Sequence, residues 1–166
     1  MKINRSYQEG LKTVYYNSPI GIIEIQATDN GLRSVSFVEG KLFSETPNAH
    51  NQLTVNQLDD YFNKKITVFD IPLDLEGTDF QKRVWHNLRD IPFGKIKSYM
   101  DIAKLMGDTK AIRAVGTANG SNKIAIIIPC HRVIGSDGSL TGYAAGIERK
   151  KWLLDFEIPP TQTTLF

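Results

Sequence analysis

Residues 98–119 read SYMDIAKLMGDTKAIRAVGTAN, and this stretch decides the fold of the second half of the chain. Ser98 is a favourable N-cap for a helix over about 99–106, and Gly107 is the residue type that commonly ends one. Residues 108–110 then form a short turn before a further helix over about 111–119. Two short helices joined by a tight turn containing glycine are typical of a helix-turn-helix. We therefore predict this motif here.

The helix predicted over 111–119 carries small side chains and one arginine, Arg113. Two interpretations are open. Small residues allow tight packing against a core, and we expect Ile112 and Val115 to pack in this way. Alternatively, the small-sided face lies against DNA while Arg113 reaches into the duplex. The residues assigned to that face are Ala114, Gly116 and Ala118.

The remaining elements follow from periodicity and turn signals. A helix over 79–89 is predicted from apolar residues at helical spacing, with Thr78 or Asp79 as its N-cap. The first 40 residues are rich in strand formers, and we predict strands over 13–16, 21–27 and 32–38. The sequence Thr28-Asp29-Asn30-Gly31 predicts a hairpin between the last two. Further predicted elements are a helix over 51–64, a strand over 66–71 and a terminal helix over 148–156.

Charge is distributed unevenly along the chain. Up to Gly77 there are 7 Lys and Arg against 10 Asp and Glu, a net of −3, whereas from Thr78 there are 13 against 8, a net of +5. Such an asymmetry indicates that the second half meets a polyanion, although chance clustering also explains it. No run approaches the roughly 18 apolar residues of a membrane span, and the N-terminus lacks a secretory signal. We expect a cytoplasmic protein without a membrane partner.

The chain contains one cysteine, Cys130. An intramolecular disulfide is therefore excluded, and a zinc site with several thiolates is excluded as well. The three histidines, His50, His86 and His131, are too scattered to form a local metal site. We expect neither a metal nor another cofactor.

Cys130 follows the most hydrophobic run of the chain, residues 124–128, which periodicity leaves open as a strand or a buried extended segment. The sequence then continues Pro129-Cys130-His131-Arg132-Val133. Cationic neighbours favour the thiolate, which is the nucleophilic form. Because an unperturbed cysteine is only a few per cent thiolate at neutral pH, a base is needed, and His131 is the obvious candidate. A carboxylate would have to orient the imidazole, and sequence distance does not identify it.

These motifs, taken in order, resemble the methylated-DNA–protein-cysteine methyltransferases, the O6-alkylguanine-DNA alkyltransferases. The resemblance covers about residues 80–157, and the Pro-Cys-His-Arg-Val pentapeptide is the family's signature. The other matching segments are Val84-Trp85, Ile91-Pro92-Phe93-Gly94, Ser98-Tyr99, Arg113-Ala114-Val115-Gly116, Asn122, Gly142-Tyr143 and Leu153-Leu154.

The resemblance implies an α+β protein of two domains. A small ribonuclease-H-like α/β domain over 1–77 precedes a mainly helical, winged helix-turn-helix alkyltransferase domain over 78–166. The implied activity is DNA repair by stoichiometric, irreversible transfer of the alkyl group from O6-alkylguanine to Cys130, after the base is flipped out of the duplex. We expect O4-alkylthymine to be a substrate as well. The implied partner is double-stranded DNA containing alkylated guanine, bound by a monomer; cooperative binding stays open.

The resemblance also implies roles for individual residues. Cys130 is the alkyl acceptor, His131 activates it through a water molecule, and Glu157 fixes the tautomer of His131. Asn122 stabilises the active-site turn, and Tyr99 donates its hydroxyl to the departing purine. Arg113 fills the gap left by the flipped nucleotide. The remaining residues expected at the substrate or DNA are Arg132, Val133, Tyr143, Ala144 and Lys150.

Two positions depart from the family pattern. Lys123 stands where proline is common, and Ala145 stands where many members have a second glycine. At Lys123 the departure bears on the rigidity of the loop, and at Ala145 the added methyl group narrows that side of the pocket. Both departures therefore bear on the tolerance for bulky alkyl groups.

Three other functions fit parts of the sequence. A damage reader that flips the base without transfer would lack the acceptor cysteine, which this chain has. A thiol-sensing winged-helix transcription factor would have no use for Tyr99 and Asn122 together with the Cys130 motif. A DNA-binding module with a structural cysteine would accept no methyl group from DNA.

Overall fold

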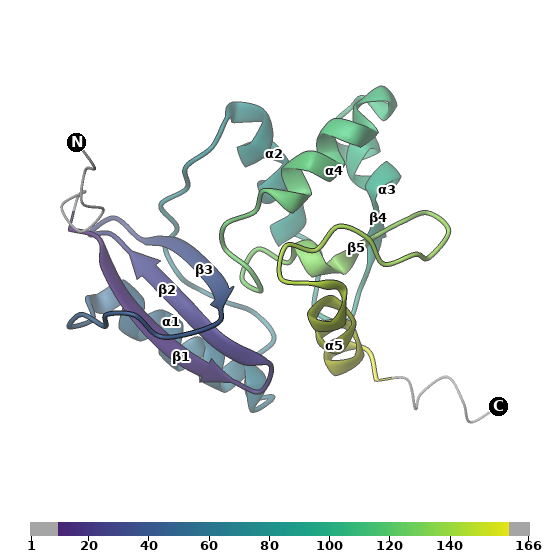
Figure 1. The fold of residues 1–166 in the computed structure, drawn as a ribbon. Helices are drawn as coiled ribbons and strands as arrows, with labels where there is room; N and C mark the ends of the chain where they lie inside the picture. Colours follow the sequence, from purple (N-terminus) through teal and green to yellow (C-terminus); the bar gives the residue numbers. More distant parts are fainter. Residues whose placement is uncertain (1–9, 160–166) are drawn as a thin grey trace. The chain divides into compact units, whose positions relative to one another are not determined.

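The computed structural model describes residues 10–159, which divide into a first unit up to Glu76 and a second unit from Gly77 (Figure 1). The first unit contains an antiparallel sheet in the order β1-β2-β3 and one helix, α1. The bounds are β1 Lys12–Ser18, β2 Gly21–Ala27, β3 Leu32–Val38 and α1 Ala49–Phe62. The three strands and the hairpin predicted at residues 28–31 are thus confirmed.

The core of the first unit forms where α1 packs across the sheet, touching all three strands (Figure 1). Val14 and Ile25 are paired across β1 and β2, and both are buried together with Leu58 of α1. Burial of these aliphatic side chains stabilises the unit by about 25 cal/mol per Å² of apolar surface removed from water.

The strand predicted over residues 66–71 is wrong. This segment has no strand, and the chain makes only an isolated parallel bridge between Leu32 and Leu73. The side chain of Gln57 on α1 explains the difference, because its amide accepts from the Asp70 N–H and donates to the Asp70 carbonyl. A helix side chain thus supplies the hydrogen bonds that a neighbouring strand would have made.

The second unit is mainly helical. Its elements are α2 Asp79–Arg89, β4 Lys97–Ser98, α3 Tyr99–Leu105, the 3-10 turn Thr109–Ala111, α4 Ile112–Gly120, the 3-10 turn Cys130–Arg132, β5 Val133–Ile134 and α5 Ile147–Glu157. The helices α2, α3 and α4 pack against one another, and β4 pairs with β5 in parallel. This arrangement confirms the predicted helix-turn-helix, with the loop between β5 and α5 beside it (Figure 1).

Capping residues explain where these helices begin. Thr78 and Gln81 form a capping box at the start of α2, and Ser98 and Asp101 form another at the start of α3. Gly107, with a φ of 80°, follows the end of α3 as predicted. The indole nitrogen of Trp85 donates to the carbonyl of Ala118 at 2.8 Å, which ties α2 to the C-terminal end of α4. These contacts fix the helix that precedes the cysteine loop.

Candidate active site

Cys130 lies at the start of the short 3-10 turn Cys130–Arg132 and is buried, with 6% of its surface exposed. The apolar run before it is neither a strand nor an extended segment, because residues 125–127 form turns. Ile126 has a φ of 72°, which is rare for a β-branched residue. The backbone therefore delivers Cys130 by a tight, strained loop.

Asn122 holds this loop together. Its side-chain oxygen accepts from the Ile124 N–H at 3.0 Å, and its amide nitrogen donates to the carbonyls of Ile128 at 2.8 Å and Ile124 at 3.3 Å. Its side chain also lowers the pKa of the Cys130 thiol. The residue expected to stabilise the turn therefore bonds the loop backbone and favours the thiolate.

Two influences act on the Cys130 thiol in opposite directions. Burial raises its pKa above the ordinary value, because a thiolate is poorly solvated inside the protein. The hydrogen bond from Asn122 and the positive charge of Lys150 lower the pKa. Since burial has the larger influence, a nearby base is needed to take the proton.

His131 is fully buried and hydrogen-bonded to Glu157. Its Nε2 lies 2.8 Å from Glu157 Oε1, and Nδ1 has no hydrogen-bond partner within residues 10–159. A carboxylate only accepts, so Nε2 must carry the hydrogen and Nδ1 is left as the acceptor. Burial lowers the pKa of His131, and the hydrogen bond to Glu157 opposes this. A neutral imidazole with a free Nδ1, on the residue that directly follows Cys130, is of the kind that can receive a thiol proton.

Arg132 occupies the other side of Glu157. Its Nε donates to Glu157 Oε2 and its NH2 to Glu157 Oε1, both at 2.8 Å, while its NH1 donates to the Ile91 carbonyl at 2.6 Å. Arg132 was expected to contact DNA or the substrate, but the structure places its guanidinium inside the fold. The reason is the buried carboxylate of Glu157, which requires a cationic partner.

These partners make Glu157 strongly acidic. Burial raises its pKa, but the hydrogen bonds and positive charges of His131 and Arg132 outweigh it and lower the pKa from 4.5 to about 2. Glu157 is therefore a carboxylate across the physiological pH range.

We expect the free energy of unfolding to fall as the pH is lowered from 4.5 towards 2. Because the folded pKa of Glu157 lies below its ordinary value, its stabilisation is fully present above pH 4.5 and is lost as the pH falls through the folded pKa. At about 1.4 kcal/mol per pKa unit, this contribution is roughly 3 kcal/mol. Denaturant unfolding of the parent and Glu157→Gln across this range measures it, and an equal loss in both proteins would contradict the prediction.

Lys150 is a second buried cation. Its Nζ donates to the carbonyls of Val133 at 2.6 Å and Thr141 at 2.9 Å, and it lies 5.9 Å from the centre of the Tyr99 ring. Burial lowers its pKa, and interaction with Cys130 opposes this. Lys150 thus joins β5 to the following loop and places positive charge near the sulfur.

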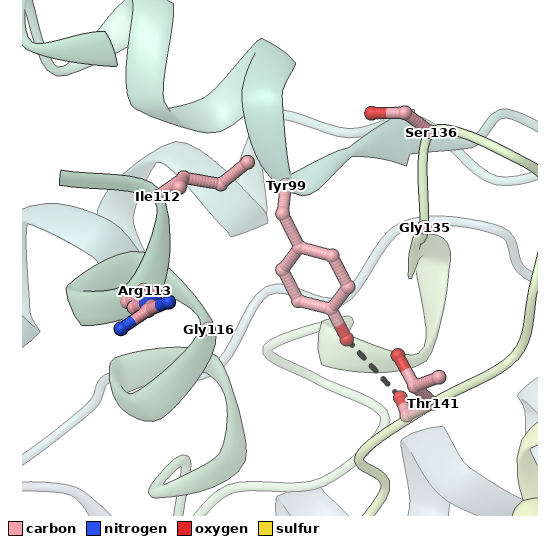
Figure 2. A pocket seen from close by; sticks show the side chains of 7 residues that line it. All are labelled: Tyr99, Ile112, Arg113, Gly116, Gly135, Ser136 and Thr141. Carbon is pink, nitrogen blue, oxygen red and sulfur yellow. Dashed lines mark hydrogen bonds between the residues drawn. The ribbon is translucent and has the colours of Figure 1, made fainter. Parts of the chain in front are cut away.

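A pocket of about 410 Å³ opens between α3, α4 and the loop after β5 (Figure 2). Its lining residues are Tyr99, Ile112, Arg113, Gly116, Gly135, Ser136 and Thr141. The hydroxyl of Tyr99 donates to the Thr141 carbonyl at 3.1 Å, so Tyr99 and Lys150 share one acceptor. A flat ligand entering here meets the exposed side of α4.

The other predicted site residues fall into two groups. Arg113, Ala114 and Ala144 are exposed. Ala118, Val133 and Tyr143 are buried, so Ala118, whose carbonyl accepts from Trp85, does not lie on the exposed face of α4. The hydroxyl of Tyr143 has no hydrogen-bond partner within residues 10–159.

Asn119 is a site residue that the sequence did not indicate. This residue is buried, and its amide nitrogen donates to the Cys130 carbonyl at 3.4 Å. Its position four residues after Val115, on the same helical face, was a signal that it points inward. The carbonyls of Ile91 and Thr141 could not be predicted either, because main-chain acceptors have no signature in a sequence.

Within residues 10–159, no group of three or more His, Cys, Asp or Glu side chains is placed to hold a metal ion. Among the same residues, no helix is long and apolar enough to cross a membrane.

Comparison with known proteins identifies both units. Residues 79–158 match the 6-O-methylguanine DNA methyltransferase DNA-binding domain, and residues 11–75 match the ribonuclease-like domain of the same family. The methylated-DNA–protein-cysteine methyltransferase of Methanosarcina acetivorans is 47% identical over 148 residues, covering 86% of this chain and 95% of that protein. The one from Mycolicibacterium paratuberculosis is 45% identical, covering 90% of this chain and 95% of that protein.

Solved structures agree with these matches. The crystal structure of Mycobacterium tuberculosis OGT in complex with DNA has a TM-score of 0.79 and 44% identity, covering 92% of this chain and 97% of that one. An O6-methylguanine-DNA methyltransferase from Pyrococcus kodakaraensis, at 22% identity and a TM-score of 0.55, shares the fold.

Proposed function

Because the chain belongs to the 6-O-methylguanine DNA methyltransferase family, we propose that Cys130 removes the alkyl group from O6 of guanine in DNA. The activity is that of a methylated-DNA–protein-cysteine methyltransferase, a DNA-repair enzyme whose second unit binds DNA. One observation supports Cys130 as the acceptor: the only cysteine of the chain directly precedes, in sequence, a histidine whose Nδ1 is left free because a buried carboxylate accepts from its Nε2.

The transfer is an in-line displacement. Nδ1 of His131 takes the thiol proton, through a water molecule, as sulfur approaches the alkyl carbon. The C–S bond forms while the bond from carbon to O6 breaks, and the electron pair of that bond passes to the purine. The purine then takes up one proton and leaves as guanine, so the atoms balance without a cofactor. Since the product is a thioether, each chain reacts once.

The base must leave the duplex for this geometry, because sulfur cannot reach the alkyl carbon inside the stack. The pocket between Tyr99 and α4 lies on the path that we propose for the base. Tyr99 would exchange its hydrogen bond to Thr141 for one to the purine ring, and Lys150 would keep the Thr141 carbonyl satisfied during that exchange. The proposed substrate is alkylated guanine in double-stranded DNA, with O4-alkylthymine as a further substrate, bound by a monomer.

The mass of the intact protein tests this function. The reduced protein is incubated with duplex DNA carrying one O6-methylguanine and then weighed by mass spectrometry. A gain of one methylene mass on Cys130, stopping at one per chain, supports the proposal. A folded protein that binds the lesion and gains no mass would be a damage reader.

We expect Arg113→Ala to slow methyl transfer from duplex DNA by about tenfold while weakening binding by about threefold or less. Arg113 is exposed on α4 and lines the pocket, which supports the proposal that its side chain fills the gap left by an extruded nucleotide. Extruding a nucleotide costs a few kcal/mol of free energy. Without the arginine side chain in the gap, this cost increases.

Single-turnover rates on duplex and single-stranded DNA separate this role from simple charge attraction. On single-stranded DNA there is no base pair to break, and the difference between Arg113→Ala and the parent should largely vanish. Lys110→Ala, which removes another exposed cation before α4, is the control. Equal rates for Arg113→Ala and the parent on duplex DNA would remove this role.

A further inference from the structure

The geometry points to Arg132 as a positioning residue of the proton relay: it holds the Glu157 carboxylate so that His131 keeps the tautomer with a free Nδ1. This inference rests on the proposed function, because it assigns a role in the same methyl transfer. This positioning role takes the place of the direct contact between Arg132 and DNA or substrate that the family resemblance implied.

Three hydrogen bonds fix the guanidinium. Two go to the two oxygens of Glu157 and one goes to the Ile91 carbonyl, with distances of 2.6–2.8 Å. The paired bonds match the planar fork of arginine to the carboxylate, and a lysine ammonium cannot make the same pair. Arg132 therefore sets the rotation of the carboxylate as well as its charge.

That rotation decides where His131 finds its acceptor. Glu157 Oε1 receives both the Arg132 NH2 and the His131 Nε2, whereas Oε2 receives the Arg132 Nε. If Arg132 were absent, the carboxylate could turn and either oxygen could face the imidazole. With Arg132 present, one oxygen is presented to Nε2, and Nδ1 is left for the proton from Cys130.

The surroundings of Arg132 exclude water from the pair. The side chains of Arg132 and Glu157 are 6% and 0% exposed. The Phe93 ring lies 5.9 Å from the guanidinium carbon, and Phe93 in turn packs edge-to-face on Phe156 of α5. A buried carboxylate without its cation would take up a proton, and a protonated Glu157 no longer specifies the donor on His131.

A double-mutant cycle tests the role. Single-turnover methyl transfer is measured for the parent, Arg132→Met, Glu157→Gln and the double variant. Each single variant is expected to be slower by about tenfold or more, because the imidazole loses its orienting partner. If Arg132 acts through Glu157, the double variant is no slower than the worse single variant. Slowing by the product of the two single effects would show that Arg132 acts elsewhere and would overturn the inference.

The pH profile separates positioning from a loss of stability. The charged or titratable groups facing Glu157 are His131, Arg132 and Tyr143, and Lys150 acts on His131. Removing the Arg132 charge raises the pKa of Glu157, so the acid decline in rate should begin at a higher pH in Arg132→Met than in the parent. Val115→Ala, a truncation of a buried apolar side chain in α4 that removes no charge or hydrogen-bonding group, should lower stability and keep the parental pH profile. An unchanged profile in Arg132→Met would overturn the inference.

Arg132→Lys keeps the test decisive if Arg132→Met does not stay folded. It retains the charge and loses the paired hydrogen bonds, so it should transfer more slowly than the parent. A parental rate and pH profile for Arg132→Lys would overturn the inference. These failures are distinct from failure of the proposed function, in which the parent itself transfers no methyl group.

Discussion

Cys130→Ala is expected to bind methylated duplex DNA with about the parental affinity and to accept no methyl group. The chain has no second cysteine that could substitute for Cys130. The substitution removes one buried sulfur from a turn whose backbone hydrogen bonds come from Asn122, Asn119 and the turn itself, so the fold should persist. Truncation of one buried atom costs about 1 kcal/mol or less.

Cys130→Ser adds a second comparison. Its hydroxyl replaces the thiol, but oxygen is far harder to ionise than sulfur and is the weaker nucleophile towards an alkyl carbon. We therefore expect transfer to Cys130→Ser to be undetectable in the time in which the parent is complete. Labelled methyl groups on DNA measure both variants, with binding followed separately by mobility shift. Incorporation of label into Cys130→Ala would show that another side chain is the acceptor.

Local patterns predicted most elements of the fold. The strands at residues 12–18, 21–27 and 32–38 followed from β-branched residues and a hairpin signal, and α2 and α3 followed from apolar spacing and N-caps. The segment at 66–71 looks equally strand-like, but the side chain of Gln57, 13 residues before Asp70, makes both hydrogen bonds to the Asp70 backbone. Such a contact depends on how α1 packs, which a local pattern does not contain.

The candidate active site likewise contains features that a local sequence pattern predicts and contacts that depend on packing. The pentapeptide at Cys130 indicated the nucleophile and its base, but bonding between His131 and Glu157 spans 26 residues and needed the resemblance or the structure. The contact of Arg132 with DNA or substrate that the resemblance implied does not agree with the buried position of its guanidinium. Its inward orientation follows from the buried carboxylate at the end of α5, which becomes its neighbour only when α5 packs on the turn.

Asn122→Ala is expected to slow methyl transfer by roughly ten- to a hundredfold and to lower the free energy of unfolding by about 2–3 kcal/mol. The side chain makes three hydrogen bonds to the loop backbone, each worth about 1 kcal/mol, and leaves buried polar groups unpaired when it is removed. The loop also holds Ile126 in its unfavourable conformation. Loss of the contact to the sulfur raises the pKa of Cys130, so less thiolate is present at neutral pH.

Asn122→Asp distinguishes the support of the loop from the effect on sulfur. It keeps the acceptor for the Ile124 N–H, loses both donated bonds and places a negative charge beside Cys130. Asn122→Asp should therefore raise the pKa of Cys130 further than Asn122→Ala, whatever their relative stabilities. The rate of Cys130 alkylation by iodoacetamide as a function of pH reports this directly. Ser121→Ala, which removes a neighbouring hydroxyl bonded to Ala118, is the control. Because burial alone raises the pKa of Cys130, a parental alkylation profile in Asn122→Ala would mean that another group must stabilise the thiolate.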